Sequence, residues 1–247
     1  MSRFPSPLRF VWILAALGVC ACAGQGKPEA GHSRDRETVV ILHGLGRTKT
    51  AMWLLASRIE RAGFDVIRIG YDSLRDPPEQ IIAAVSRQID ACCASLSTPV
   101  HFVGHSLGGL IIRAYLAQHP MRSRGRVVLI ATPNAGTPLV DLYRDAWWME
   151  LAGPTARQLG TNRESFPNSL PAPDYPVGVI AGTAVVPLLK DLIPGDDDGM
   201  VPVASTKVAG MVDFVSIESN HAAMRYNEQV ASQTIAFLRT GRFERDR

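Results

Sequence analysis

PVHFVGHSLGG, residues Pro99 to Gly109, joins an apolar run to a glycine-rich turn that holds Ser106. The run before the turn contains Val100, Phe102 and Val103 and is typical of a buried strand. After the turn, apolar side chains recur at helical spacing through residue 116. The stretch therefore predicts a strand, a sharp turn and a helix, with a serine at the turn.

This arrangement suits a serine nucleophile. A serine hydroxyl reacts only when it is held within reach of a base. Gly104 and Gly108, two positions before and after Ser106, leave room for a strained turn and for close packing. The helix that follows would direct its free N–H groups toward the serine, so the Leu107 amide is a candidate oxyanion donor.

Length and composition describe an ordinary globular protein. The chain has 247 residues, which is enough for one sizeable core or two small ones. The net charge of +3 and the scattered arginines do not indicate a nucleic-acid partner. No metal-binding or cofactor motif is present, so we expect no cofactor and no metal.

The first 23 residues are expected to be a signal peptide. Arg3 and Arg9 precede an apolar run at residues 10–19, which is short for a membrane span. Cys20 and Cys22 each follow a loose bacterial lipobox, whereas residues 21–23 fit ordinary cleavage. We expect a lipid-anchored protein of the bacterial cell envelope, with a secreted or periplasmic protein as the alternative. Residues 24–37 are expected to form a polar tether.

The remaining cysteines, Cys92 and Cys93, are neighbours in an expected helix. A disulfide between adjacent cysteines closes a strained ring. We therefore expect two unpaired, partly buried side chains.

Apolar, strand-like stretches alternate with helical patterns along residues 38–247. Strands are expected at residues 38–42, 65–69, 126–130, 177–181 and 213–217 and in the run that leads into Ser106. Helices are expected at residues 51–62, 76–93 and 229–238 and after Ser106. This order predicts an α/β fold with a mostly parallel sheet of about six strands and helices on both faces.

The alternation breaks between about residues 136 and 175. Trp147, Trp148 and Met149 make this segment too apolar for a simple solvated helix. It could form a short cap over the ligand edge of the sheet, with Trp147 and Trp148 in contact with substrate. The alternative is a plain helix that buries its aromatic side chains on the sheet.

The position of His221 makes it the expected general base. Only His119 and His221 follow Ser106, and His119 lies at the far end of the helix. His221 comes after the last strand, at the edge where parallel strands present ligands. Among the earlier histidines, His105 is expected to pack and His43 to shape its loop.

An acidic run supplies the expected third member of the site. Asp198 is the first choice because it directly precedes the turn at Gly199, and Asp197 and Asp196 follow in that order. Asp213 begins a strand and would lie at the wrong edge of the sheet.

The loop after the first strand carries His43, Gly44 and Leu45. The Leu45 amide is expected to join that of Leu107 in an oxyanion hole, where each donor contributes about 3 kcal/mol in the transition state. His43 and Gly44 are expected to contribute to substrate binding.

Together these motifs resemble the α/β-hydrolase superfamily, and within it the bacterial serine lipases and carboxylesterases. The resemblance covers residues 38–238 and rests on five segments in the family's order: HGLG (43–46), GHSLGG (104–109), TPNAGT (132–137), DDGMVP (197–202) and SNHAAM (219–224). It implies a Ser106–His221–Asp198 triad, oxyanion amides at Leu45 and Leu107, and ester hydrolysis through an acyl-enzyme. The cap is shorter than the lid of triglyceride lipases.

The expected substrate is an acyl ester with an apolar chain, and a lipid anchor would bring the protein to a membrane surface. An acyltransferase, thioesterase or peptidase could use the same triad. A non-catalytic envelope binding protein is an alternative from another class, which an intact triad argues against.

Overall fold

The computed structural model of the chain describes residues 36–119, 124–185 and 192–245. The expected signal peptide, Cys20, Cys22 and nearly all of the expected tether lie outside these residues. Among the described helices, none combines the length and the hydropathy needed to cross a membrane.

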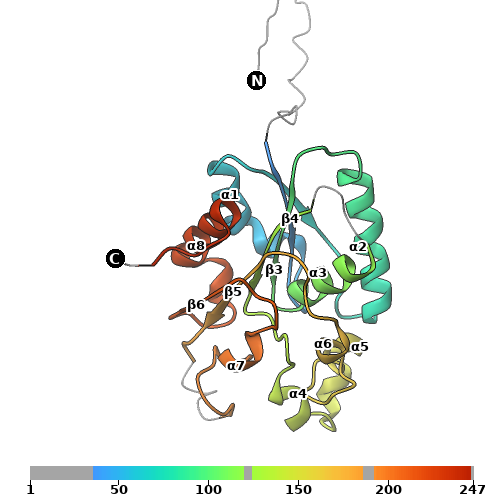
Figure 1. Cartoon of the computed structure of the whole chain (residues 1–247). Coiled ribbons are helices and arrows are strands. Elements are labelled where there is room, and N and C mark those ends of the chain that lie inside the picture. The colour runs from blue at the N-terminus through green and yellow to red at the C-terminus, as the bar shows by residue number, and fades with distance from the viewer. Residues whose placement is uncertain (1–35, 120–123, 186–191, 246–247) are drawn as a thin grey trace, which may run out of the picture. The chain divides into compact units, whose positions relative to one another are not determined.

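A six-stranded parallel sheet forms the centre of the protein (Figure 1). The strand order is β2-β1-β3-β4-β5-β6, and every neighbouring pair is parallel. The strands are β1 (Thr38–Leu42), β2 (Asp65–Ile69), β3 (Val100–His105), β4 (Arg124–Ile130), β5 (Val177–Gly182) and β6 (Asp213–Ile217). The predicted parallel sheet is confirmed.

Helices cover both faces of the sheet, as predicted. On one face lie α2 (Pro78–Cys93) and α3 (Leu107–Gln118), and on the other lie α1 (Trp53–Arg61) and α8 (Glu228–Thr240) (Figure 1). Short helical turns add η1 (Lys49–Met52), α7 (Val203–Thr206) and η4 (Ala223–Arg225).

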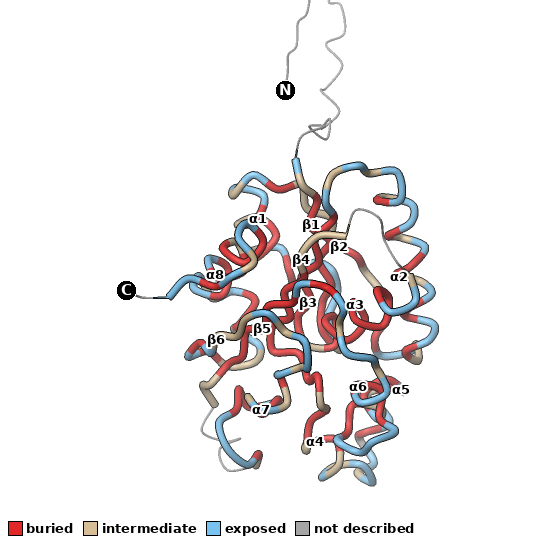
Figure 2. Tube along the Cα trace, viewed as in Figure 1, coloured by how far each residue is buried: buried red, intermediate tan, exposed pale blue. Residues whose placement is uncertain are grey.

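The strands are buried because each contributes apolar side chains to two cores. In β1, Val40 and Leu42 pack in the core under α2 and α3, whereas Val39 and Ile41 pack in the core under α1 and α8. Alternate residues of a strand point to opposite faces, so a continuous apolar run is needed. Figure 2 shows the buried strands between partly exposed helices.

The segment between β4 and β5 forms a cap of short helices rather than one plain helix. It contains α4 (Pro138–Leu142), η2 (Trp147–Glu150), α5 (Gly153–Ala156) and α6 (Phe166–Ser169), and α4, α5 and α6 gather beyond the carboxyl ends of the strands (Figure 1). Side chains join the cap to the body: Thr155 Oγ1 donates to the Asp76 carbonyl at 2.8 Å, and Arg113 donates to the carbonyls of residues 170 and 171.

The expectation for the adjacent cysteines is wrong. Cys92 and Cys93 form a disulfide in the last turn of α2, with Cα atoms 3.8 Å apart.

Candidate active site

Ser106 occupies a strained turn between β3 and α3. Its backbone has φ 55° and ψ −125°, and its N–H donates to the Ile130 carbonyl at 2.9 Å. A Cβ on Gly104 would lie 2.5 Å from Gly109, and a Cβ on Gly108 would lie 2.5 Å from the Leu42 carbonyl oxygen. The turn therefore depends on the two glycines, as the sequence pattern predicts.

His221 connects Ser106 to Asp198. Its Nε2 lies 3.0 Å from Ser106 Oγ, and its Nδ1 lies 2.7 Å from Asp198 Oδ2. The His221 side chain is 15 % exposed and the Asp198 side chain is fully buried. These contacts fit a base that accepts the serine proton and a carboxylate that orients the ring. The structure brings together the three side chains chosen from the sequence.

The Asp198 carboxylate is held by its own loop. Oδ1 accepts the N–H groups of Met200 and Val201 at 3.0 and 2.8 Å, which leaves Oδ2 for His221. At the end of β5, a Cβ on Gly182 would lie 2.8 Å from Asp198 Cβ, so the glycine makes room for the acid.

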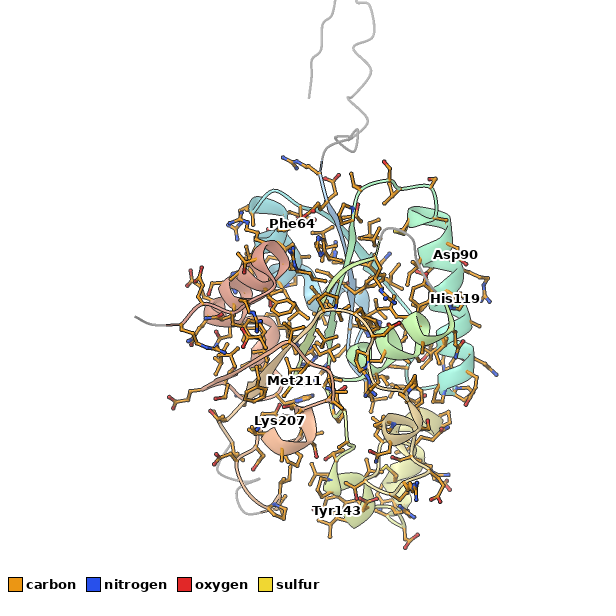
Figure 3. The ribbon with its side chains drawn as sticks, viewed as in Figure 1. Phe64, Asp90, His119, Tyr143, Lys207 and Met211 are labelled. Atoms are coloured by element: carbon orange, nitrogen blue, oxygen red, sulfur yellow. A yellow bond between two sulfur atoms is a disulfide. The ribbon has the colours of Figure 1, made fainter. Side chains whose placement is uncertain are left out.

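The other candidate acids and histidines have different partners. Asp197 Oδ1 accepts the Gly199 N–H at 2.6 Å, and Asp213 accepts the Phe243 N–H at the opposite edge of the sheet. The His119 ring forms a hydrogen bond with the Tyr115 carbonyl at the end of α3. Figure 3 shows His119 away from the cap, which is marked there by Tyr143. Asp196 is exposed. Asp198 and His221 are thus the pair that meets Ser106.

Two backbone amides are positioned near Ser106. Leu107 is the first residue of α3, so its N–H has no acceptor one turn earlier in the helix. Leu45 lies in the turn after β1 and lines the same pocket as Ser106. The Gly46 N–H donates to Ser73 Oγ at 2.9 Å and holds that turn in place. This arrangement keeps both residues as oxyanion-hole candidates.

His43 is buried beneath the pocket and does not line it, so the expectation of direct substrate contact is not supported. Its ring stacks on Tyr71 with centroids 4.1 Å apart, and Tyr71 Oη donates to the His43 carbonyl. Burial lowers the pKa of His43. Gly44 does line the pocket. Tyr71 was missed because it follows a separate strand and has no motif of its own.

Ser106 and His221 open into a pocket of about 540 Å³, within the usual range for small-molecule sites. Much of its wall is apolar and comes from the cap: Leu139, Val140, Tyr143, Met149, Ala152, Ala156 and Leu159. The cap therefore supplies a surface suited to an aliphatic chain.

Trp147 lies outside this pocket. It is 78 % exposed and lines an adjoining hollow with Arg144 and Arg157. In the one-turn helix η2, Met149 is buried and Trp147 is exposed, because residues two positions apart on a helix point in different directions. The predicted substrate contact of Trp147 is corrected accordingly, and the side chain of Trp148 lies outside the described part of the structure.

His105 packs beside the site. It is buried, and its Nε2 lies 2.9 Å from the His221 carbonyl oxygen, so it supports the loop that carries His221. Burial, and after it the neighbouring His221, hold the pKa of His105 well below 6.5.

We expect the buried histidines to make the protein less stable in mild acid. The pKa values of His43, His101 and His105 are lowered by burial, so the unfolded chain takes up protons first as the pH falls through 6.5. The free energy of unfolding should then fall by up to about 1.4 kcal/mol per pH unit for each such histidine. Urea unfolding at pH 7.5 and 5.5 measures this loss.

His105→Gln is the matched variant, because a glutamine amide can still donate to the His221 carbonyl. Its free energy of unfolding should change less between the two pH values than that of the wild type. An equal change in both proteins would contradict a neutral, buried His105.

No cluster of three or more metal-binding side chains occurs among the described residues. Of the His105 ring nitrogens, Nδ1 is buried without a hydrogen-bond partner among these residues.

Residues 38–162, about half of the chain, match the family model described as palmitoyl protein thioesterase. The match begins with β1 and includes the Ser106 turn and most of the cap. A comparison with curated proteins found no match.

Several solved structures share the fold. The mature lipase BlEst2 of Bacillus licheniformis has a TM-score of 0.69 and 17% identity, over 87% of this chain and 96% of the lipase. The phospholipase PlaB of Legionella pneumophila has a TM-score of 0.60 and 15% identity, over 83% of this chain and 57% of its own. The metagenomic carboxyl esterase MGS0156 has a TM-score of 0.58 and 17% identity, over 82% of this chain and 69% of its own. The expected α/β-hydrolase fold is confirmed.

Proposed function

Because this chain belongs to the palmitoyl protein thioesterase family, we propose that it is a serine hydrolase of acyl esters and thioesters. Ser106 is the proposed nucleophile, His221 the general base and Asp198 the residue that orients it. The observation that carries the proposal is the continuous hydrogen-bond chain from Ser106 Oγ through His221 to Asp198.

The chemistry follows from the partners of His221, because an ionised carboxylate only accepts hydrogen bonds. His221 Nδ1–H donates to Asp198, which leaves Nε2 free to accept the Ser106 proton as Oγ attacks the acyl carbonyl. The amides of Leu45 and Leu107 would stabilise the oxyanion. Protonated His221 then donates to the departing alcohol or thiol, and an acyl-enzyme remains. Water, activated by the same Nε2, releases the acid and restores Ser106.

Thioesters are included because of the family to which the chain belongs. A thiolate is a better leaving group than an alkoxide, so the same site can cleave both bonds. An acyltransferase would use the same acyl-enzyme with an alcohol in place of water. Adding glycerol during turnover and measuring acylglycerol against free acid separates transfer from hydrolysis.

The proposed acyl group is an apolar chain lying along the cap. Ala152 lines the pocket and is partly exposed, so Ala152→Phe should narrow the pocket without disturbing a core. Loss of contact with about two methylene groups corresponds to roughly 10-fold in kcat/KM. We expect that loss on dodecanoyl and longer esters of p-nitrophenol, with acetate hydrolysis much less affected.

Trp147→Ala is the control for this prediction, because Trp147 is exposed and lies outside the pocket. The chain-length profile of this variant should match that of the wild type. If Ala152→Phe reduced turnover of all chain lengths equally, the cap would not be the acyl-binding wall.

The proposed location is the bacterial cell envelope, with a lipid anchor at Cys22 or Cys20 and a soluble secreted or periplasmic form as the alternative. Radiolabelled palmitate should be incorporated into the full chain in a bacterial host. Loss of the label in Cys22→Ser but not in Cys20→Ser would assign the anchor to Cys22. An unlabelled wild type would favour the soluble form.

The direct test of the proposed function uses the detergent-solubilised full chain, a fluorophosphonate probe and an ester substrate. The probe should attach at Ser106, which peptide mass spectrometry can identify. Hydrolysis of p-nitrophenyl octanoate should fall in proportion to the fraction of protein that is labelled. Turnover that continues after complete labelling would refute the assignment of Ser106. A folded protein that neither reacts with the probe nor cleaves ester or thioester would favour the non-catalytic binding protein.

A further inference from the structure

Two arginines line the same pocket as Ser106, together with the apolar wall of the cap. Arg47 follows the Leu45 turn by two residues, and Arg225 follows His221 by four. The segments that carry them are far apart in the sequence and meet at the pocket. Both guanidinium groups are therefore close to the parts of the site proposed to do the chemistry.

Arg225 is held in place but keeps donors available. Its side chain is buried apart from the pocket, with only 7 % of the residue exposed. Nε donates to the Ala222 carbonyl at 3.1 Å, and the guanidinium lies over the Tyr226 ring at 4.8 Å. These two contacts fix the plane of the group and use one of its five donors. Within the described residues, the terminal nitrogens of Arg225 form no hydrogen bond.

Arg47 provides a second positive charge at the rim. It is exposed, and it forms neither a hydrogen bond nor an ion pair with any described residue. Its charge acts on Arg225 and on His105, whose pKa values it helps to lower. The two arginines are thus close enough to repel each other, which is unfavourable unless an anion lies between them.

No carboxylate of the pocket offsets this charge. Asp198 is the one acidic residue among the described residues that line it, and both of its oxygens are occupied by His221 and by backbone amides. One part of the pocket surface is therefore positively charged, and the part formed by the cap is apolar. A neutral lipid alone would leave two guanidinium groups unpaired.

Building on the proposed hydrolase function, we propose that Arg47 and Arg225 bind an anionic group on the alcohol or thiol portion of the substrate. An apolar acyl chain matches the cap wall, so an anion must lie on the other side of the scissile bond. A phosphate ester fits best, since arginine donates two parallel hydrogen bonds to phosphate oxygens. Such a phosphate occurs in phospholipid headgroups and in acyl-coenzyme A thioesters.

A pair of chromogenic esters isolates the charge: 3-nitro-4-(octanoyloxy)benzoate and its neutral methyl ester. Both have the same acyl chain and differ by one carboxylate on the leaving group. After correction for their rates of alkaline hydrolysis, the wild type should prefer the anionic ester. The double variant R47Q/R225Q should lower the anionic-to-neutral ratio of kcat/KM by about 10- to 100-fold, mainly through KM.

Matched variants identify the cause of that loss. Arg225→Lys keeps a charge and should recover part of the ratio, and added salt should weaken the preference of the wild type. Arg61→Gln removes an arginine on α1, outside the pocket, and should leave the ratio unchanged. Fluorophosphonate labelling of Ser106 in R47Q/R225Q verifies that the site remains assembled.

Two phosphate substrates distinguish the sources: dioctanoyl phosphatidic acid and octanoyl-coenzyme A. A loss in R47Q/R225Q on the first would assign the site to a lipid headgroup, and a loss on the second to a thioester carrier. An unchanged anionic-to-neutral ratio, or a loss on neither phosphate substrate, would overturn the inference while the hydrolase proposal stands. A wild type that cleaves none of these compounds would instead overturn the hydrolase proposal.

Discussion

Ser106→Ala should lower kcat/KM for esters and thioesters by about 10⁴- to 10⁶-fold, because alanine has no Oγ to form the acyl-enzyme. The fold should survive the change. Ser106 has φ 55°, and Ala131 shows that this chain accommodates an alanine with φ 48°. Esterase and thioesterase assays that resolve rates over at least five orders of magnitude test the loss of activity. A melting curve tests whether the fold survives.

Ser232→Ala is the control for Ser106→Ala, because Ser232 lies exposed on α8 and bonds only its own helix. It should retain wild-type turnover and fluorophosphonate labelling. Substantial turnover in a folded Ser106→Ala protein would mean that another group acts as the nucleophile, and the mechanism proposed above would fail.

Asp198→Asn should lower kcat by about 10⁴-fold. The amide can keep the contacts with the backbone N–H groups of residues 200 and 201, so the loop should remain folded. Its NH₂ group would donate to His221 Nδ1, which forces the proton onto Nε2 and removes the acceptor for Ser106. Steady-state kinetics from pH 6 to 9 would measure the loss across the range in which a serine hydrolase works.

The neighbouring acids provide matched controls for Asp198→Asn. Asp197→Asn keeps an oxygen for the Gly199 N–H and does not touch His221, so its kcat should stay within a few-fold of the wild type. Asp196→Asn changes an exposed carboxylate and should behave like the wild type. If Asp197→Asn were the most damaging of the three, the assignment of the acid would be wrong.

The proposed site depends on loops that support one another. The His221 N–H donates to the Asp198 carbonyl at 2.9 Å, and His105 contacts the His221 carbonyl, so both the acid loop and the serine turn hold the base. Tyr71 and His43 likewise support the loop that carries Leu45. Substitutions at these supporting residues should alter alignment and rate even though the residues touch no substrate.

Sequence patterns were sufficient to predict the strands of the sheet. The boundaries of β1, β2 and β6 are those predicted, and β4 differs by two residues at its start. Continuous apolar runs bounded by turns reflect short-range preferences and burial on both faces, and both can be recognised without knowing the partner strands. The serine turn was predictable for the same reason, because Gly104 and Gly108 are a local requirement of its geometry.

The order of Ser106, Asp198 and His221 along the chain was also sufficient to select them, since parallel strands bring their carboxyl ends to one edge. What patterns could not supply is the direction of side chains in irregular segments. Trp147 and Met149 are two residues apart in a short turn, and only the packing of the cap determines that the methionine faces the pocket.

Contacts between distant segments required the tertiary structure as well. Arg47 and Arg225 are separated by most of the chain, and neither belongs to a motif. Three strands separate β1 from β6 in the sheet, so the shared position of the two arginines at the pocket depends on the loops that follow these strands. Local sequence thus determined the strands, the serine turn and the order of the proposed catalytic groups. Long-range packing decided the wall and charge of the pocket, because those properties arise where separate loops converge.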